Sequence, residues 1–123
     1  MKIFIQINSI VFFLYGVGFV LFPENLSQIV TETTPASTSG LIDMRATYGG
    51  MSVAFALLLA YMTRAANTLR LGVVAVVLMM SGMALGRMVG MVLDGAPNNL
   101  MYIYLFLELL MIGIGARFLS KKG

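Results

Sequence analysis

Long apolar segments alternate with short polar ones along the chain. Four apolar runs cover residues 3–22, 41–62, 71–93 and 100–119. Each run has about the 20 residues that an α-helix needs to cross the hydrocarbon core of a bilayer. Backbone N–H and C=O groups cannot stay unpaired in lipid, so runs of this kind form helices. The pattern therefore predicts an all-α fold, a bundle of four transmembrane helices that run up-down-up-down and antiparallel.

Composition supports a single integral membrane domain over residues 1–123. In this chain 59% of the residues are hydrophobic and 11% are charged, whereas about a quarter of the residues of a soluble domain are charged. We expect the first run to stay as a helix, because it is longer than the apolar core of a signal peptide and contains Gln6 and Asn8. His and Cys are both absent, which removes the commonest general base and the usual zinc ligands. No metal and no cofactor is predicted.

The polar connections predict the orientation in the membrane. Residues 23–40 form a Thr/Ser-rich segment without a positive charge, which we expect to be an outside loop, and the turn near residues 94–99 lies on the same side. Lys and Arg prefer cytoplasmic segments. The basic residues collect in three segments that four crossings place together: Lys2, Arg64, Arg70, Arg117, Lys121 and Lys122. The chain is therefore expected to span a cytoplasmic membrane with both termini on the cytoplasmic side. Charges scattered in this way do not form a nucleic-acid-binding stripe.

Glycines recur at helical spacing in the third run. Gly82, Gly86 and Gly90 follow one another every four residues and share one helix face. Small residues at this spacing let a neighbouring backbone approach closely. We interpret this face as a packing seam, either within the chain or between copies, and place the third run at the centre of the bundle. The adjacent glycines Gly49 and Gly50 of the second run are assigned to packing as well.

Arg45, Arg87 and Glu108 are the candidates within the apolar runs for charges that lie inside the membrane. A charge in the membrane costs at least about 2.5–3.5 kcal/mol on insertion scales and almost always faces the bundle interior. At a rise of about 1.5 Å per residue, Arg87 lies roughly 10 Å and Glu108 roughly 13–14 Å below the turn between the last two runs. Helical side chains lean toward their own N-terminus, so these two lean toward each other. The sequence predicts an Arg87–Glu108 ion pair.

Arg45 enters near the outer end of the second run. We expect it to lean toward the interface and to pair with Asp43 or Asp94, which completes a charged cluster in the outer half of the bundle. One interpretation is structural, because buried arginine–carboxylate contacts can fix helix register. The other is a polar pocket that opens outward, in which arginines hold an anionic head group or carboxylate.

The motifs DMRATYGG and ALGRMVGMVLDGAP, together with the FPENL turn and an acid in the last run, resemble those of a bacterial family known as domain of unknown function 4345. The resemblance covers nearly the whole chain. The resemblance implies a small four-helix membrane protein and indicates neither a substrate nor an activity. It points to the residues at the family's motif positions: Arg45, Tyr48, Gly49, Gly50, Gly86, Arg87, Gly90, Asp94, Gly95 and Glu108. Tyr48 thereby joins the charged cluster.

Three functions are compatible with these features. The sequence favours a non-enzymatic membrane protein that forms a homo-oligomer or serves as an accessory subunit of a larger complex. The alternative is a binding or transport module that holds a lipid or another small anionic or amphiphilic ligand, and one four-helix chain would have to self-associate for transport. A membrane-embedded enzyme ranks last, because Glu108 or Tyr48 would have to act as acid or base without a nucleophile–base pair.

Overall fold

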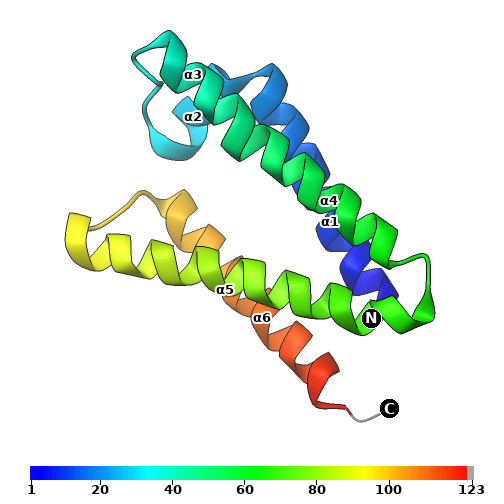
Figure 1. Ribbon diagram of the computed structural model, residues 1–123. Coiled ribbons are helices and arrows are strands. Elements are labelled where there is room, and N and C mark those ends of the chain that lie inside the picture. The colour runs from blue at the N-terminus through cyan, green and yellow to red at the C-terminus, as the bar shows by residue number, and fades with distance from the viewer. Residues whose placement is uncertain (122–123) are drawn as a thin grey trace.

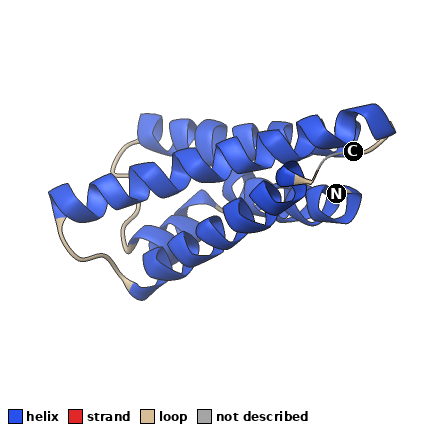
Figure 2. Cartoon of the chain, turned by 90° about the horizontal axis from the view of Figure 1, so that it is seen from below, coloured by secondary structure: helices blue, strands red, loops and turns tan. Residues whose placement is uncertain are grey.

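The computed structural model describes residues 1–121, and these residues form helices and short connections without a strand (Figures 1 and 2). The predicted all-α fold is confirmed. Lys122, part of the predicted basic tail, lies outside the described residues. In chain order the elements are α1 (Lys2–Leu21), α2 (Pro23–Thr31), α3 (Thr38–Met44), the π-helical η1 (Arg45–Gly50), α4 (Met51–Met62), the 3₁₀ turn η2 (Ala66–Thr68), α5 (Leu69–Asp94) and α6 (Asn99–Ser120).

Within residues 1–121, three helices are long and apolar enough to cross a membrane: α1, α5 with the turn before it, and α6. The run expected to give another crossing, residues 41–62, is not one α-helix. It consists of α3, η1 and α4, with 7, 6 and 12 residues. The backbone stays right-handed helical at both junctions, with φ −64° and ψ −41° at Met44 and φ −61° and ψ −40° at Met51. The second apolar run therefore forms a composite helix, whose π-helical part interrupts the α-helical pattern.

The helices are arranged as two pairs. The composite helix α3–η1–α4 lies beside α1, and α5 lies beside α6 (Figure 1). The pairs meet near the end that holds both termini and diverge toward the end that holds α2 and the α5–α6 turn. The core lies where the pairs meet, and its fully buried members come from three helices: Ile5, Leu59, Val73 and Val76.

The surface of the helices is largely apolar. Val92 is 83% exposed and Phe106 is 64% exposed. Only 11% of the most apolar window of α6 is buried within the chain. Apolar side chains exposed along three long helices indicate a membrane protein, because lipid covers them at no hydrophobic cost.

Two glycines bring α1 and η1 into backbone contact. A Cβ atom at Gly16 would lie 2.7 Å from the carbonyl oxygen of Gly49, and one at Gly49 would lie 2.9 Å from the backbone nitrogen of Val20. Both distances are below any real Cβ contact. The sequence gives no sign of this role for Gly16, whose backbone meets that of Gly49.

The packing role expected for the α5 glycines is not met within this chain. A Cβ atom at Gly82 or Gly86 would have no neighbour within 4 Å, and one at Gly90 would touch only the carboxylate of Asp94 on the same helix. Gly50 likewise has only the carbonyl of Arg45 near it, at 3.8 Å. The reason is geometric: Gly82 and Gly86 line an open cavity, described below, instead of facing a neighbouring helix.

The segment expected to be an outside loop contains a helix. α2 begins with Pro23 in its first turn, has Glu24 beside it, and ends where Glu32 adopts a left-handed conformation with φ 64°. Proline is favoured in a first helical turn and an acid stabilises that end. The fully buried hydroxyl of Ser27 donates to the carbonyl of Thr33 at 2.6 Å and fixes the chain reversal that follows.

Candidate functional site

Arg87 of α5 and Glu108 of α6 form the predicted ion pair. Arg87 Nε donates to Glu108 Oε1 at 2.7 Å, and Nη2 donates to Oε2 at 3.2 Å. Two parallel N–H···O contacts of this kind are the strongest arginine–carboxylate geometry. Glu108 is 4% exposed. The carboxylate is thus held inside the α5–α6 pair with its charge neutralised.

The remaining contacts of Arg87 also come from α6. Its Nη1 donates to the sulfur of Met101 at 3.1 Å, and its guanidinium lies 5.2 Å from the ring centroid of Tyr104. Met101, Tyr104 and Glu108 follow one another at spacings of three and four, so they share one face of α6. Arg87 therefore lies along this face, and three of its five N–H donors are used there.

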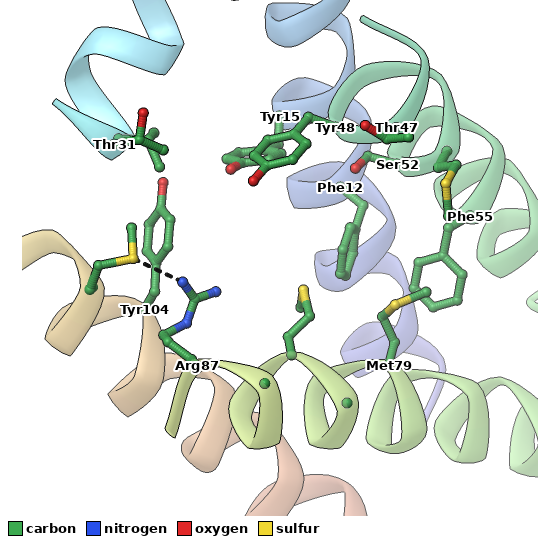
Figure 3. A pocket seen from close by; sticks show the side chains of 16 residues that line it. Phe12, Tyr15, Thr31, Thr47, Tyr48, Ser52, Phe55, Met79, Arg87 and Tyr104 are labelled. Atoms are coloured by element: carbon green, nitrogen blue, oxygen red, sulfur yellow. Dashed lines mark hydrogen bonds between the residues drawn. The ribbon is translucent and has the colours of Figure 1, made fainter. Parts of the chain in front are cut away.

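A cavity of about 440 Å³ lies between the two helix pairs (Figure 3). Aromatic and methionine side chains form most of its wall, Gly82 and Gly86 form part of the α5 side, and Arg87 is its charged group. The lining residues are Phe12, Tyr15, Val30, Thr31, Thr47, Tyr48, Met51, Ser52, Phe55, Met79, Gly82, Met83, Gly86, Arg87, Met101 and Tyr104.

Three tyrosines give the cavity its polar side. Figure 3 shows the hydroxyls of Tyr15, Tyr48 and Tyr104 pointing into the cavity. Their rings belong to one connected series: Tyr104 to Tyr15 at 6.4 Å between centroids, Tyr15 to Phe19 at 4.8 Å, and Phe19 to Tyr48 at 5.2 Å. The series connects α6, α1 and η1, so it links the helix pairs beside Arg87.

Two of these tyrosines were not predicted as site residues. The position of Tyr104 near the end of a run is typical of an interfacial aromatic belt, and Tyr15 had no assigned role. A signal was present for Tyr104, which lies four residues before Glu108 and therefore on the same helix face. For Tyr15 the sequence carries no comparable signal, because its neighbours come from other helices.

Arg45 is not part of the cavity. Its Nη1 donates to the carbonyl of Val20, in the last turn of α1, and its side chain is otherwise exposed. The expected partners Asp43 and Asp94 are exposed and do not pair with it, since Arg87–Glu108 is the one ion pair among residues 1–121. Carbonyls in the last turn of a helix lack intrahelical partners and attract cations, which explains why Arg45 binds α1 instead.

The predicted cluster is therefore split. Arg87, Glu108 and Tyr48 belong to the cavity or support it. Asp94 borders a separate, smaller depression of about 340 Å³ at the α5–α6 turn, which Arg87 also lines. Asp43 and Arg45 lie on the outer surface of the composite helix.

A hydrogen bond ties the α5–α6 turn to α2 beside the cavity. Asn98 caps α6 by accepting from the backbone N–H of Met101 at 3.0 Å, and its Nδ2 donates to the carbonyl of Val30 at 3.2 Å. Val30 and Thr31 line the cavity from α2. One side chain thus connects the two halves of the molecule where their helices diverge.

A comparison with known families covers almost the whole chain. The family model described as "Domain of unknown function (DUF4345)" matches residues 1–118, which include the ion pair and every residue that lines the cavity. Comparison with curated proteins and with solved structures gives no match.

Proposed function

The chain belongs to the family of domain of unknown function 4345, and we propose that it is a four-span membrane protein that binds an amphiphilic molecule of the bilayer. The ligand would occupy the cavity between the helix pairs. The observation that carries this proposal is the cavity itself: about 440 Å³, with a wall of aromatic and methionine side chains and a few polar groups on one side. Small-molecule sites have volumes of roughly 300–1,000 Å³ and this same distribution of apolar and polar groups.

The four-span topology is part of the proposal. The composite helix of residues 38–62 would be the second crossing, antiparallel to α1, because the two lie side by side. The basic segments lie at the end of the molecule that holds the termini, where Arg70 donates to the carbonyl of Leu119 at 2.9 Å. By the preference of Lys and Arg for the cytoplasm, this end would face the inside of a cytoplasmic membrane and the cavity would lie in the outer half.

A second candidate is association with another helix, either from a second copy or from a larger membrane complex. Gly82 and Gly86 favour it, because their helix face is open and no atom lies within 4 Å of a Cβ built there. Small residues at this spacing are a common contact surface between membrane helices. This helix would enter the same cavity, so the two functions exclude each other in one molecule.

Native mass spectrometry from a mild detergent separates the two candidates. We expect the protein to retain a bilayer amphiphile, and we expect Gly86→Leu to lose about 90% of that adduct, because the leucine fills the cavity. Gly113→Leu is the matched control: Gly113 also has open space at its Cβ but lies on α6 outside the cavity. Equal adducts on all variants would contradict ligand binding, and a dimer that Gly86→Leu alone dissociates would establish the second candidate.

A further inference from the structure

We infer that the cavity selects an uncharged amphiphile, with hydroxyl or carbonyl oxygens in its head group, over an anionic one. This inference rests on the proposed function and names its ligand class. The sequence suggested an anion site formed by Arg45 and Arg87. Only Arg87 reaches the cavity, and Glu108 already neutralises its charge.

The charge balance of the site disfavours an anion. Glu108 occupies Arg87 through two hydrogen bonds. A carboxylate or phosphate entering the cavity would have to share Arg87 with Glu108, which brings two negative groups together in a medium of low dielectric constant. Arg45, the other cation of the outer half, is engaged by the Val20 carbonyl and does not line the cavity. The site therefore has no net positive charge to offer.

The hydrogen-bonding groups that face the cavity suit neutral oxygens. The hydroxyls of Thr31 and Thr47 donate to carbonyls of their own helices, at 2.7 Å and 2.8 Å. The hydroxyls of Tyr15, Tyr48 and Tyr104 point inward instead. A phenol both donates and accepts, and Arg87 keeps N–H donors beyond those that Glu108 and Met101 occupy. Together they fit a head group of hydroxyl or ester oxygens.

The apolar part of the wall accommodates the hydrocarbon part of such a molecule. Phe12 and Phe55 lie in edge-to-face contact at 4.9 Å between centroids, and Met79 and Met83 line the cavity from α5. Methionine side chains adapt to ligands of irregular shape. The polar and apolar groups are therefore segregated within one cavity, as an amphiphile requires.

Two probes with the same hydrocarbon tail and different head groups test the selectivity of the cavity. Unlabelled oleyl alcohol and oleyl phosphate each compete with tritiated oleyl alcohol for the protein in phosphatidylcholine nanodiscs. Nanodiscs that contain Gly86→Leu measure how much of the tritiated probe partitions into the lipid alone. We expect the alcohol to compete at a concentration at least about tenfold lower than the phosphate, a difference of about 1.4 kcal/mol. Equal or stronger competition by the phosphate would overturn the inference and leave ligand binding standing.

A charge variant provides the second measurement. Glu108→Gln keeps the shape of the side chain and releases the positive charge of Arg87. We expect it to shift the preference by about tenfold toward oleyl phosphate, and an unchanged preference would overturn the charge argument. Both probes are measured on the same preparation of the variant. If Glu108→Gln does not fold, the ratio of the competing concentrations of the two probes on the wild-type protein decides whether the cavity prefers the uncharged amphiphile. Binding of neither probe above the Gly86→Leu level would contradict the proposed function itself.

Discussion

At the scale of single residues, the ion pair shows how the membrane constrains side chains. Glu108 is nearly fully buried among apolar helices, and Arg87 gives it two hydrogen bonds. Removing one partner leaves a charge that neither lipid nor protein can solvate, at a cost of about 3–5 kcal/mol in buried pairs. Replacing both partners by neutral groups removes the desolvation penalty together with the attraction. The pair is therefore expected to behave as a unit.

A double-mutant cycle tests this coupling. We expect Arg87→Gln and Glu108→Gln each to lower the free energy of unfolding by about 3 kcal/mol. The double variant should lose less than the sum of the two by at least about 1 kcal/mol. Unfolding in mixed detergent micelles, followed by circular dichroism, measures all four proteins. Additive losses would mean that the two groups do not interact in the folded protein.

Residue type and depth in the membrane were enough to predict the Arg87–Glu108 pair. They were not enough to predict the partner of Arg45. Arg87 and Glu108 flank one short turn, so counting residues from that turn places them at similar depth on adjacent helices. The partner of Arg45 is a backbone carbonyl, that of Val20. Every residue carries a carbonyl, so the sequence gives no sign of which one a distant arginine will meet.

At the scale of elements, the glycine contacts decide how the helices pair. The spacing of Gly82, Gly86 and Gly90 correctly places them on one helix face, but spacing says nothing of what covers that face. In the folded chain the close contact is made by Gly16 and Gly49, which lie on different helices and belong to no repeat within either one. The π-helical turn η1 sets this geometry, because it puts Gly49 on α1 while Thr47 and Tyr48 line the cavity.

Adjacent glycines give a matched test of that contact. We expect Gly49→Ala to lower the free energy of unfolding by about 1–3 kcal/mol, because the new methyl group would overlap the backbone of α1. Gly50→Ala, one residue later in the same turn, should change it by less than about 0.5 kcal/mol or stabilise slightly, since alanine favours helices. Thermal melts in detergent compare the two variants. Equal effects would show that α1 and η1 do not touch at Gly49.

At the scale of the whole molecule, the two ends differ in charge and in packing. The end with the termini carries most of the basic residues, among them Lys2, Arg70 and Arg117, and the tightly packed core. At the other end the helix pairs separate around the cavity, and Asn98 joins them by a single hydrogen bond to α2. The apolar runs predicted the helices and their approximate bounds. They did not predict the cavity, because it results from the angle between the pairs, which depends on contacts between residues far apart in the sequence, such as Tyr15 and Tyr104.

The absence of cysteine from the sequence makes the topology directly testable. Single-cysteine variants Thr34→Cys, Asn67→Cys and Ser120→Cys each carry one thiol in a segment between or after the apolar runs. A membrane-impermeant maleimide is applied to intact cells and to permeabilised cells. We expect Thr34→Cys to be labelled in both, and Asn67→Cys and Ser120→Cys to be labelled only after permeabilisation, because basic segments stay in the cytoplasm.

This labelling pattern separates four crossings from three. If residues 38–62 do not cross the bilayer, the segments around Thr34 and Asn67 lie on the same side, and the two crossings by α5 and α6 return Ser120 to that side as well. All three variants would then react alike in intact cells. Only a crossing by the composite helix separates Thr34 from Asn67. Since Tyr48 and Phe55 of this helix line the cavity, the same result decides whether the cavity has a wall within the membrane.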